Sequence, residues 1–240
     1  SSDLLGANQT LYETTNFSTY TLLYTFPASS PSYVMFDGIH YWFTGGGTFK
    51  STDLISFLVP ANVSLSSIAW NGSIYVGKGE LNGVEGMLKS TDGINWVVSG
   101  TLYQFSYFEK VITDGTNFIT FGGAIGLIGP RTVAYQSTNG TTWTEYTPLQ
   151  SYFSDPIGGG YVSDMMYNGT AYMASGKNFN VGLGRNGIVY STTFGGTYTL
   201  ATGSSSAPIQ SQQDDGFNAN YFWGYPTQYR PTNMPTPTPN

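Results

Sequence analysis

Acid–base chemistry in this chain would depend on two glutamates, Glu80 and Glu85, which lie in the Gly-rich stretch 77–86. Two carboxylates on either side of a glycosidic bond can hydrolyse it, one as the acid and the other as nucleophile or base. His40 is the single histidine, and no Ser nucleophile motif accompanies it. One histidine without any cysteine also argues against zinc. The sequence therefore predicts no metal and no cofactor, and the glutamate pair is the catalytic alternative.

Binding chemistry is the other possibility for the charged and aromatic residues of three stretches, 77–86, 122–131 and 176–187, and of two linking segments. Aromatic rings beside neutral hydrogen-bonding groups suit sugar rings or protein partners. The alternative is that the rings pack between sheets and the charges are solvated. The candidate binding residues are Lys78, Glu80, Glu85, Tyr103, Phe105, Tyr107, Arg131, Tyr152, Phe153, Lys177 and Arg185.

The elements that would position these residues follow from a repeated turn, best seen in the Ser-Thr-Asp-Gly-Ile-Asn-Trp sequence at 90–96. An Asp in such a turn accepts backbone N–H bonds, Gly supplies a positive φ, and the aromatic residue starts the next strand. Copies at 51–57 and 137–143 are clear, and degenerate copies lie at 14–20 and 192–198. The predicted structural residues of these turns are Asp53, Phe57, Asp92, Gly93, Trp96, Asn139, Gly140 and Trp143.

A second turn signal alternates with the first. Asp-Gly or Asn-Gly pairs begin at positions 37, 71, 114, 168 and 215, each next to a β-rich stretch. Two hairpins in each repeat of roughly 40–50 residues are typical of a propeller blade. The sequence therefore predicts an all-β, five-bladed propeller of four-stranded antiparallel blades, in which strands from 10–24 and 205–228 complete one shared blade. Residues 1–9 are expected to form an extension, 10–225 the propeller, and 226–240 a Pro-rich tail.

The Ser-Thr-Asp-Gly-x-x-Trp turn resembles the Asp-box, or BNR-type, repeat of sialidases and of other propellers. In that family the repeat is structural, so the resemblance implies the architecture and no chemistry. Sialidases also use three arginines, a Tyr nucleophile with a Glu, and an Asp. This chain has three arginines, Arg131, Arg185 and Arg230, but none precedes the first Asp box and one lies in the Pro-rich tail. The sialidase catalytic set is not expected here.

Composition limits the classes of partner. Charged residues make up 9% of the chain, the formal net charge is −6, and Lys and Arg together number 8 without a basic cluster. Nucleic-acid binding needs grouped cations, so nucleic acid is not an expected partner, and no apolar run is long enough for membrane insertion. A Gly-rich chain that is 16% aromatic suits many short strands and turns.

The function predicted from these features is that of a non-enzymatic propeller at an extracellular, cell-surface or virion location. It would assemble with protein partners or attach to surface glycans through the face that carries the links between second and third strands. The alternative is a carbohydrate-active enzyme or lectin that uses the same face.

Overall fold

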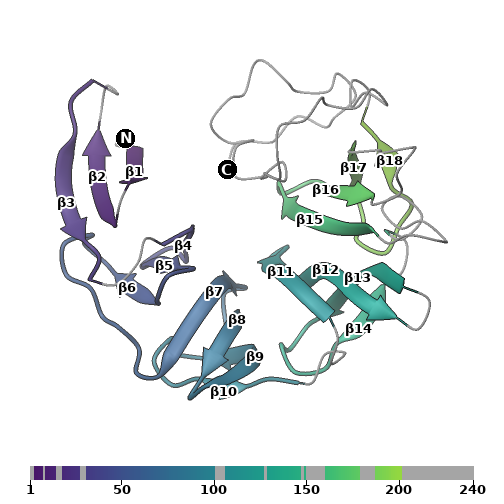
Figure 1. Cartoon of the computed structure of the whole chain (residues 1–240), viewed down its shortest axis with the longest axis horizontal. Coiled ribbons are helices and arrows are strands. Elements are labelled where there is room, and N and C mark those ends of the chain that lie inside the picture. The colour runs from purple at the N-terminus through teal and green to yellow at the C-terminus, as the bar shows by residue number, and fades with distance from the viewer. Residues whose placement is uncertain are drawn as a thin grey trace. The chain divides into compact units, whose positions relative to one another are not determined.

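The computed structural model describes residues 3–7, 9–14, 18–27, 31–100, 106–126, 129–146, 149, 160–178 and 187–201. These residues form antiparallel β-sheets, in which the strands follow one another in chain order (Figure 1). The chain divides into two compact units, residues 1–101 and 102–240. The described residues confirm the prediction of an all-β fold with antiparallel sheets.

Unit 1 contains three sheets. Sheet 1 consists of β1 (Asp3–Ala7), β2 (Thr10–Thr14) and β3 (Thr21–Thr25). Sheet 2 consists of β4 (Tyr33–Phe36), β5 (Tyr41–Thr44) and β6 (Phe49–Ser51). Sheet 3 consists of β7 (Val63–Trp70), β8 (Tyr75–Leu81), β9 (Val84–Ser90) and β10 (Val97–Val98). In sheet 2 the fourth position is taken by Leu58, which forms an isolated bridge with Lys50 through backbone bonds of 2.8 and 2.9 Å.

Unit 2 contains two four-stranded sheets among its described residues. Sheet 4 consists of β11 (Ser106–Thr113), β12 (Phe118–Gly126), β13 (Gly129–Ser137) and β14 (Thr144–Tyr146). Sheet 5 consists of β15 (Gly160–Tyr167), β16 (Tyr172–Asn178), β17 (Gly187–Ser191) and β18 (Thr199–Leu200). The described residues include no helix long and apolar enough to cross a membrane.

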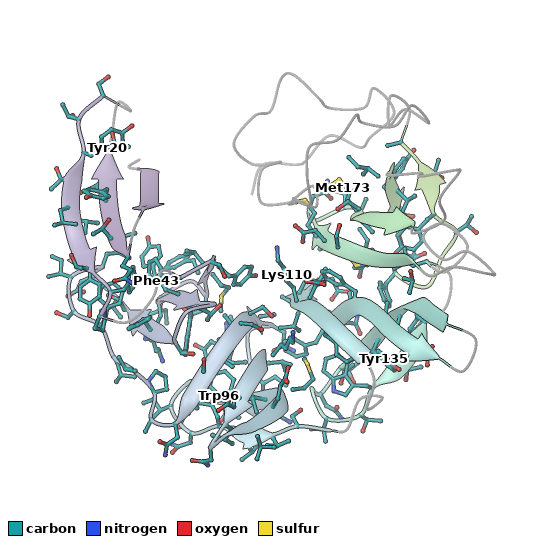
Figure 2. The ribbon with its side chains drawn as sticks, viewed as in Figure 1. Tyr20, Phe43, Trp96, Lys110, Tyr135 and Met173 are labelled. Carbon is teal, nitrogen blue, oxygen red and sulfur yellow. The ribbon has the colours of Figure 1, made fainter. Side chains whose placement is uncertain are left out.

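Apolar clusters lie between consecutive sheets of each unit. Sheets 1 and 2 enclose Leu11, Phe26, Phe43 and Phe49, and sheets 2 and 3 enclose a second cluster that includes Trp42, Leu65, Ile68, Leu88 and Trp96. Figure 2 labels Phe43 and Trp96, one from each cluster. In unit 2, Phe121, Met165 and Val189 belong to the cluster between sheets 4 and 5. Because side chains alternate along β5, Phe43 and Trp42 serve opposite faces of sheet 2.

The first strand of sheets 3, 4 and 5 carries a β-bulge at the same place relative to the turn that follows. The register shifts between Leu65 and Ser67 in β7, between Phe108 and Lys110 in β11, and between Val162 and Asp164 in β15. A bulge adds one residue and increases the local twist of the strand. The repeat is therefore conserved within the chain in its irregularities as well as in its turns.

Three expectations differ from the structure in their boundaries. Residues 1–9 were expected to lie outside the sheets, but β1 occupies Asp3–Ala7 and pairs with β2. The stretch 77–86 is predicted to lie on the face that carries the links between second and third strands, but it consists of the ends of β8 and β9 with a two-residue turn between them. Most of 122–131 likewise belongs to β12 and β13. The closing strands of 205–228 and the tail 226–240 lie outside the described residues.

Candidate functional site

The end of the β8–β9 hairpin is the best-described part of the predicted binding face. Asn82 and Gly83 form its turn, with φ values of 53° and 81°, while Leu81 pairs with Val84 across it. Two consecutive residues with positive φ are typical of a type I′ turn, whose twist matches that of the flanking strands. Because of this Asn-Gly turn, β8 and β9 form one continuous, rigid hairpin.

Glu80 and Glu85 lie directly opposite each other on this hairpin. Residues so paired have Cβ atoms about 4.5–5.5 Å apart, and like charges in these positions repel. Both glutamates are exposed, as is Val84, which is 55% exposed. A glycosidase acid instead needs a buried or charge-paired environment that keeps it protonated. Lys78, two residues before Glu80, shares its face of the hairpin.

The opposite face of the hairpin end is aliphatic. Leu81 packs against the cluster between sheets 2 and 3, and its cross-strand neighbour is the exposed Val84. A Cβ atom on Gly86 would lie 3.8 Å from Val98 Cγ1, which places Val98 on this same face. The β8–β9 end, defined as Lys78, Glu80, Leu81, Val84, Glu85 and Val98, thus has a charged face and an aliphatic face.

Glycine is required where β8 passes the bulge of β7. A Cβ atom on Gly79 would lie 2.1 Å from the carbonyl oxygen of Ser64 and 2.8 Å from Leu65 Cα. A Cβ on Gly77 would lie 2.8 Å from Leu65 Cδ2. The backbone contacts exclude a side chain at Gly79, and a side chain at Gly77 would have to displace Leu65, so these glycines fix how closely the hairpin approaches the first strand.

The Ser-Thr-Asp-Gly turn of sheet 3 links β9 to β10 by side-chain bonds to the backbone. Asp92 Oδ1 accepts bonds from the N–H groups of Ile94 and Asn95, both at 2.8 Å. Ser90 Oγ accepts a bond from the Gly93 N–H at 2.8 Å and donates to Asp92 Oδ1 at 2.9 Å. The same pattern occurs in sheets 2 and 4, at Ser51 with Asp53 and at Ser137 with Asn139.

The aromatic residue that follows each of these turns packs into the sheets. Trp96 is 7% exposed, and its ring centroid lies 6.2 Å from that of Trp42. Phe57 packs against the cluster between sheets 1 and 2, and Trp143 packs against the cluster of Phe108, Val133 and Tyr135. In the position after the Asp or Asn, Gly93 and Gly140 have φ values of 70° and 67°, and Leu54 adopts 62° in the copy without glycine.

Hydrogen bonds keep the turn carboxylates ionised. Backbone bonds from Ser56 and Ile55 lower the pKa of Asp53 to about 2. Backbone bonds from Ile94 and Asn95 lower the pKa of Asp92 as well. A carboxylate stabilised in this way accepts hydrogen bonds and has no proton to give near neutral pH. These aspartates hold turns together and are unsuited to act as general acids.

Asp37, in the β4–β5 turn, joins sheet 2 to sheet 3. Its side chain is 2% exposed. Asp37 Oδ2 accepts bonds from Trp42 Nε1 at 2.9 Å and from the Tyr75 hydroxyl at 2.6 Å. Asp37 Oδ1 accepts bonds from the N–H groups of Ile39 and His40 at 2.8 and 2.7 Å. His40 Nδ1 lies 3.1 Å from Asp37 Oδ2, so the single histidine belongs to this structural network.

The electrostatics of this network favour a charged Asp37 and a neutral Tyr75. Burial raises the pKa of Asp37, but hydrogen bonds from Tyr75, His40, Trp42 and Ile39 outweigh it, and the net pKa lies well below its usual range. Burial and the Asp37 carboxylate both raise the pKa of Tyr75 above its usual value. The proton therefore stays on the tyrosine, which acts as a hydrogen-bond donor.

Lys50 adds a second connection between sheets 2 and 3. Its Nζ atom donates a bond to the Asp92 carbonyl oxygen at 3.1 Å and lies 5.0 Å from the Trp42 ring centroid. The residue is 8% exposed, and burial lowers its pKa despite the opposing charges of Asp37 and Asp92. A cation over a tryptophan ring, bonded to a turn carbonyl, anchors that turn to the neighbouring sheet.

Unit 2 repeats the connection made by Asp37. Asp114, in the β11–β12 turn, accepts bonds from the N–H groups of Thr116 and Asn117 at 2.8 and 2.6 Å. Asp114 Oδ2 also accepts a bond from the hydroxyl of Tyr172 in sheet 5. Burial raises the pKa of Asp114, but the bonds from Asn117 and Tyr172 lower it further, so the net shift is downward.

Lys110 and Asp164 form an ion pair between β11 and β15. Lys110 Nζ lies 3.2 Å from each carboxylate oxygen of Asp164, and the Asp164 side chain is 4% exposed. Figure 2 labels Lys110 on β11. Both residues adjoin the bulges of their strands. The pair links the first strands of sheets 4 and 5, so both charges take part in a structural contact.

The remaining predicted binding residues fall into two groups. Tyr107, Arg131 and Lys177 lie in β11, β13 and β16, where their backbones pair with Gly123, Ala124 and Tyr161, and only their backbones are described. The others lie outside the described residues, namely Tyr103, Phe105, Tyr152, Phe153 and Arg185. Among the candidates, only Lys78, Glu80 and Glu85 have described side chains, and they gather on one hairpin.

The inter-sheet carboxylates are the main feature that sequence reasoning missed. A signal for them exists in the turn type. Asp37 and Asp114 are each matched by a tyrosine in the next sheet, four residues after that sheet's own turn Asx. Where the turn residue is Asn71, the corresponding residue of the next repeat is Phe118, which has no hydroxyl. In these three cases the turn residue is Asp where the next repeat supplies a tyrosine hydroxyl as donor, and Asn where it does not.

Among the described residues, no group of three or more His, Cys, Asp or Glu side chains is arranged to hold a metal ion. The polar groups with described geometry act in turns or between sheets, and the β8–β9 end is where charges and apolar groups face outward together. This end is the candidate binding site.

No protein-family model and no curated protein matches the chain. Among solved structures, it is similar to the GH74 xyloglucanase from Xanthomonas campestris, with 13% identity and a TM-score of 0.49 over 79% of this chain and 34% of that one. It is also similar to the GH74 enzyme from Niastella koreensis, with 17% identity and a TM-score of 0.40 over 80% of this chain and 28% of that one. The chain therefore spans about a third of the length of these proteins, or less.

Proposed function

We propose that the chain is a five-bladed β-propeller, with sheets 1–5 as blades and the first blade completed by strands from both ends of the chain. We further propose that it is a non-enzymatic module that assembles with protein partners at an extracellular or virion surface. The repeated sheets support the first part. Each of sheets 3–5 places a copy of the Ser/Thr-rich turn between its third and fourth strands, and sheet 2 places one between its third strand and the bridge at Leu58. Sheets 3–5 also repeat the same bulge.

The observation that carries the function is the two-faced β8–β9 end. Its aliphatic face exposes Val84 and Val98, which are 55% and 49% exposed, beside Leu81. Its other face carries Lys78, Glu80 and Glu85. Protein interfaces combine an apolar centre with a charged rim, and grouped exposed apolar residues commonly mark such contacts. A rigid type I′ hairpin presents both faces without the entropy cost of ordering a loop.

The use of the described carboxylates supports a non-enzymatic role. Asp37, Asp53, Asp92 and Asp114 have lowered pKa values because they accept bonds from backbone or ring groups of the fold. Asp164 is held by Lys110. Acid catalysis uses a carboxyl with a raised pKa. In the part of the chain that the structure describes, the acidic groups with lowered pKa values therefore hold turns and neighbouring sheets together.

A carbohydrate-active enzyme or lectin is the alternative, because Glu80 and Glu85 are cross-strand neighbours and glycosidases use a pair of carboxylates. Two sets of substitutions separate the possibilities. Glu80→Gln with Glu85→Gln removes both charges, and Val84→Asp disrupts the aliphatic face. Ile94→Asp is the matched control, because Ile94 is 51% exposed in the same sheet but lies in the turn at the opposite end.

The experiment measures association of the purified full chain with proteins from its native surface, binding to a glycan array, and hydrolysis of chromogenic glycosides. We expect a specific protein complex that Val84→Asp abolishes and Ile94→Asp preserves. Glycan binding by the unmodified chain that is lost in the double Gln variant would replace the proposal with a lectin. Hydrolysis lost in that variant would replace it with an enzyme.

A further inference from the structure

Four Asn-Gly pairs lie in turns among the described residues, and they differ in what the asparagine side chain does. The pairs begin at positions 71, 82, 139 and 168. In three of them the carboxamide oxygen accepts bonds from the backbone N–H groups two and three residues later. These bonds measure 3.1 Å from both Ser73 and Ile74 to Asn71, 2.8 and 2.9 Å in the turn at 139, and 3.0 and 2.8 Å in the turn at 168. At Asn82 the described residues supply no bond to the side chain, and only its backbone N–H is bonded, to the Asn62 carbonyl oxygen at 3.0 Å.

The turn at Asn82 is also open on the side of its glycine. Asn82 and Gly83 are both exposed, and an added Cβ atom on Gly83 would have Glu80 Oε1 as its nearest neighbour, at 3.9 Å. The Gly83 N–H lies within the two-residue turn, outside the ladder that joins β8 to β9. In contrast, the Gly140 N–H donates to Ser137 Oγ at 2.9 Å. The carboxamide carbon of Asn82 and the nitrogen that follows it are therefore free to approach each other.

We propose that Asn82 is a site of self-modification, at which the chain converts this residue into Asp or isoaspartate and thereby disables the β8–β9 end. The Gly83 nitrogen forms a bond with Asn82 Cγ, the bond from Cγ to the amide nitrogen breaks, and that nitrogen leaves as ammonia with the Gly83 proton. One water molecule then opens the five-membered imide ring. Opening at Cγ gives an Asp side chain, whereas opening at the main-chain carbonyl carbon gives isoaspartate, in which the backbone runs through Cβ and Cγ. Glycine favours ring closure because it has no Cβ atom to hinder the approach.

The side-chain bonds of the other three turns oppose this reaction. Cγ reaches the following nitrogen only when the side chain rotates about its Cα–Cβ bond, and Asn71 would then lose both bonds to its oxygen. Their N–H donors would lose an acceptor, which is unfavourable. Asn82 loses no such bond. Asn71 is the matched comparison, because it lies in the same sheet and is followed by Gly72, which has a φ of 94° and no atom within 4 Å of an added Cβ.

Both products change the β8–β9 end. An acidic side chain at position 82 places a third carboxylate beside Glu80 and Glu85, which already repel each other across the hairpin. Isoaspartate adds a carbon atom to the backbone of a type I′ turn, whose two residues fix the register of the strands. Val84 then loses its fixed place opposite Leu81. This consequence for binding rests on the proposed function of the β8–β9 end, whereas the modification itself does not.

The rates of ammonia loss at two asparagines of the unmodified full chain test the proposal. Cleavage after Lys places Asn82 in the peptide 79–89 and Asn71 in the peptide 51–78, so mass spectrometry with fragmentation follows the exchange of amide for acid at each position. In denaturant the two rates should be comparable, because both residues precede glycine. In the folded chain we expect Asn82 to react at least about tenfold faster, because rotation of Asn71 breaks two hydrogen bonds. Equal rates in the folded chain would overturn the proposal.

A second measurement tests the effect on the hairpin. After incubation, chains that an isoaspartyl methyltransferase labels should exchange the amide hydrogens of peptide 79–89 faster than the fresh chain and should lose the partner that the fresh chain binds. Asn82→Gln is the control, because ring closure from its longer side chain is slow, and its exchange should not change on incubation. Unchanged exchange or a retained partner in the labelled chains would overturn the claim that the modification disables the β8–β9 end. If the fresh chain binds no partner, the proposed function fails, and the rates at Asn82 and Asn71 still decide the modification.

Discussion

The two faces of sheet 2 show what a complete neighbouring sheet does for a strand. Toward sheet 3, Trp42 is 0% exposed and packs with residues from four-stranded sheet 3, including its first strand. Toward sheet 1, Phe43 is buried, but Phe36 on the neighbouring β4 is 54% exposed. Both faces are apolar in sequence. Among the described residues, burial on each face therefore follows whether the facing sheet has a strand at the matching position.

The largest expected effect is on the complete face. Trp42→Ala should lower the free energy of unfolding by about 4 kcal/mol, because it removes a buried ring and leaves a cavity. Denaturant titration of the full chain measures the change. A loss under about 1 kcal/mol would mean that the face toward sheet 3 is no better packed than the face toward sheet 1.

Asp37→Ala should have the next largest effect, about 3 kcal/mol, because Trp42 Nε1 and the Tyr75 hydroxyl would lose a buried charged acceptor. Tyr75→Phe removes one donor and leaves the carboxylate other partners, so about 1–2 kcal/mol is expected. A double-mutant cycle measures the coupling between the two residues. Additive losses would show that the link between sheets 2 and 3 does not contribute as a unit.

The same carboxylate makes stability depend on pH. The pKa of folded Asp37 lies below the usual value of 3.8, so its contribution is complete above that pH and is lost as pH falls further. Asp53 follows the same sign, with its contribution lost between 3.8 and about 2. Unfolding curves from pH 6 to pH 2 should show stability falling below about 4, with a smaller fall in Asp37→Asn. An unchanged slope in that variant would contradict the assignment.

Gly93→Ala should cost about 2 kcal/mol, because the residue has a φ of 70° and a Cβ would lie 2.5 Å from Trp42 Cη2. Leu54 holds the same place in sheet 2 at a φ of 62° and packs against the cluster between sheets 1 and 2. Leu54→Gly is the matched control, since relief of backbone strain there offsets lost packing. Thermal unfolding compares the two, and equal losses would remove the contrast between the faces.

The smallest expected effect is that of Phe36→Ala, about 1 kcal/mol, because the Phe36 ring is 54% exposed and its centroid lies 4.6 Å from that of Tyr41 on the neighbouring strand. Denaturant titration of the full chain measures the change. A loss as large as that of Trp42→Ala would contradict the difference between the two faces.

Part of the candidate site follows from sequence, and part does not. Asn82-Gly83 is a strong hairpin signal, and reading it as a type I′ turn gives the register that pairs Glu80 with Glu85. The Asp37 network is harder to foresee, because Tyr75 lies 38 residues away and only packing of two sheets brings the groups together. The strand β1 was missed because Asp3–Ala7 is short and lacks clear alternation.

The sequence by itself determined the local structure of this protein. Ser-Thr-Asp-Gly and Asx-Gly turns satisfy their own backbone groups within a few residues, so they specify hairpins wherever they occur. The tertiary structure alone decided which apolar residues are buried and which carboxylates join sheets. Those outcomes require groups distant in the chain to meet. Val34 and Ile68 are equivalent in the repeat, but among the described residues only Ile68 has a first strand of the preceding sheet packed against it.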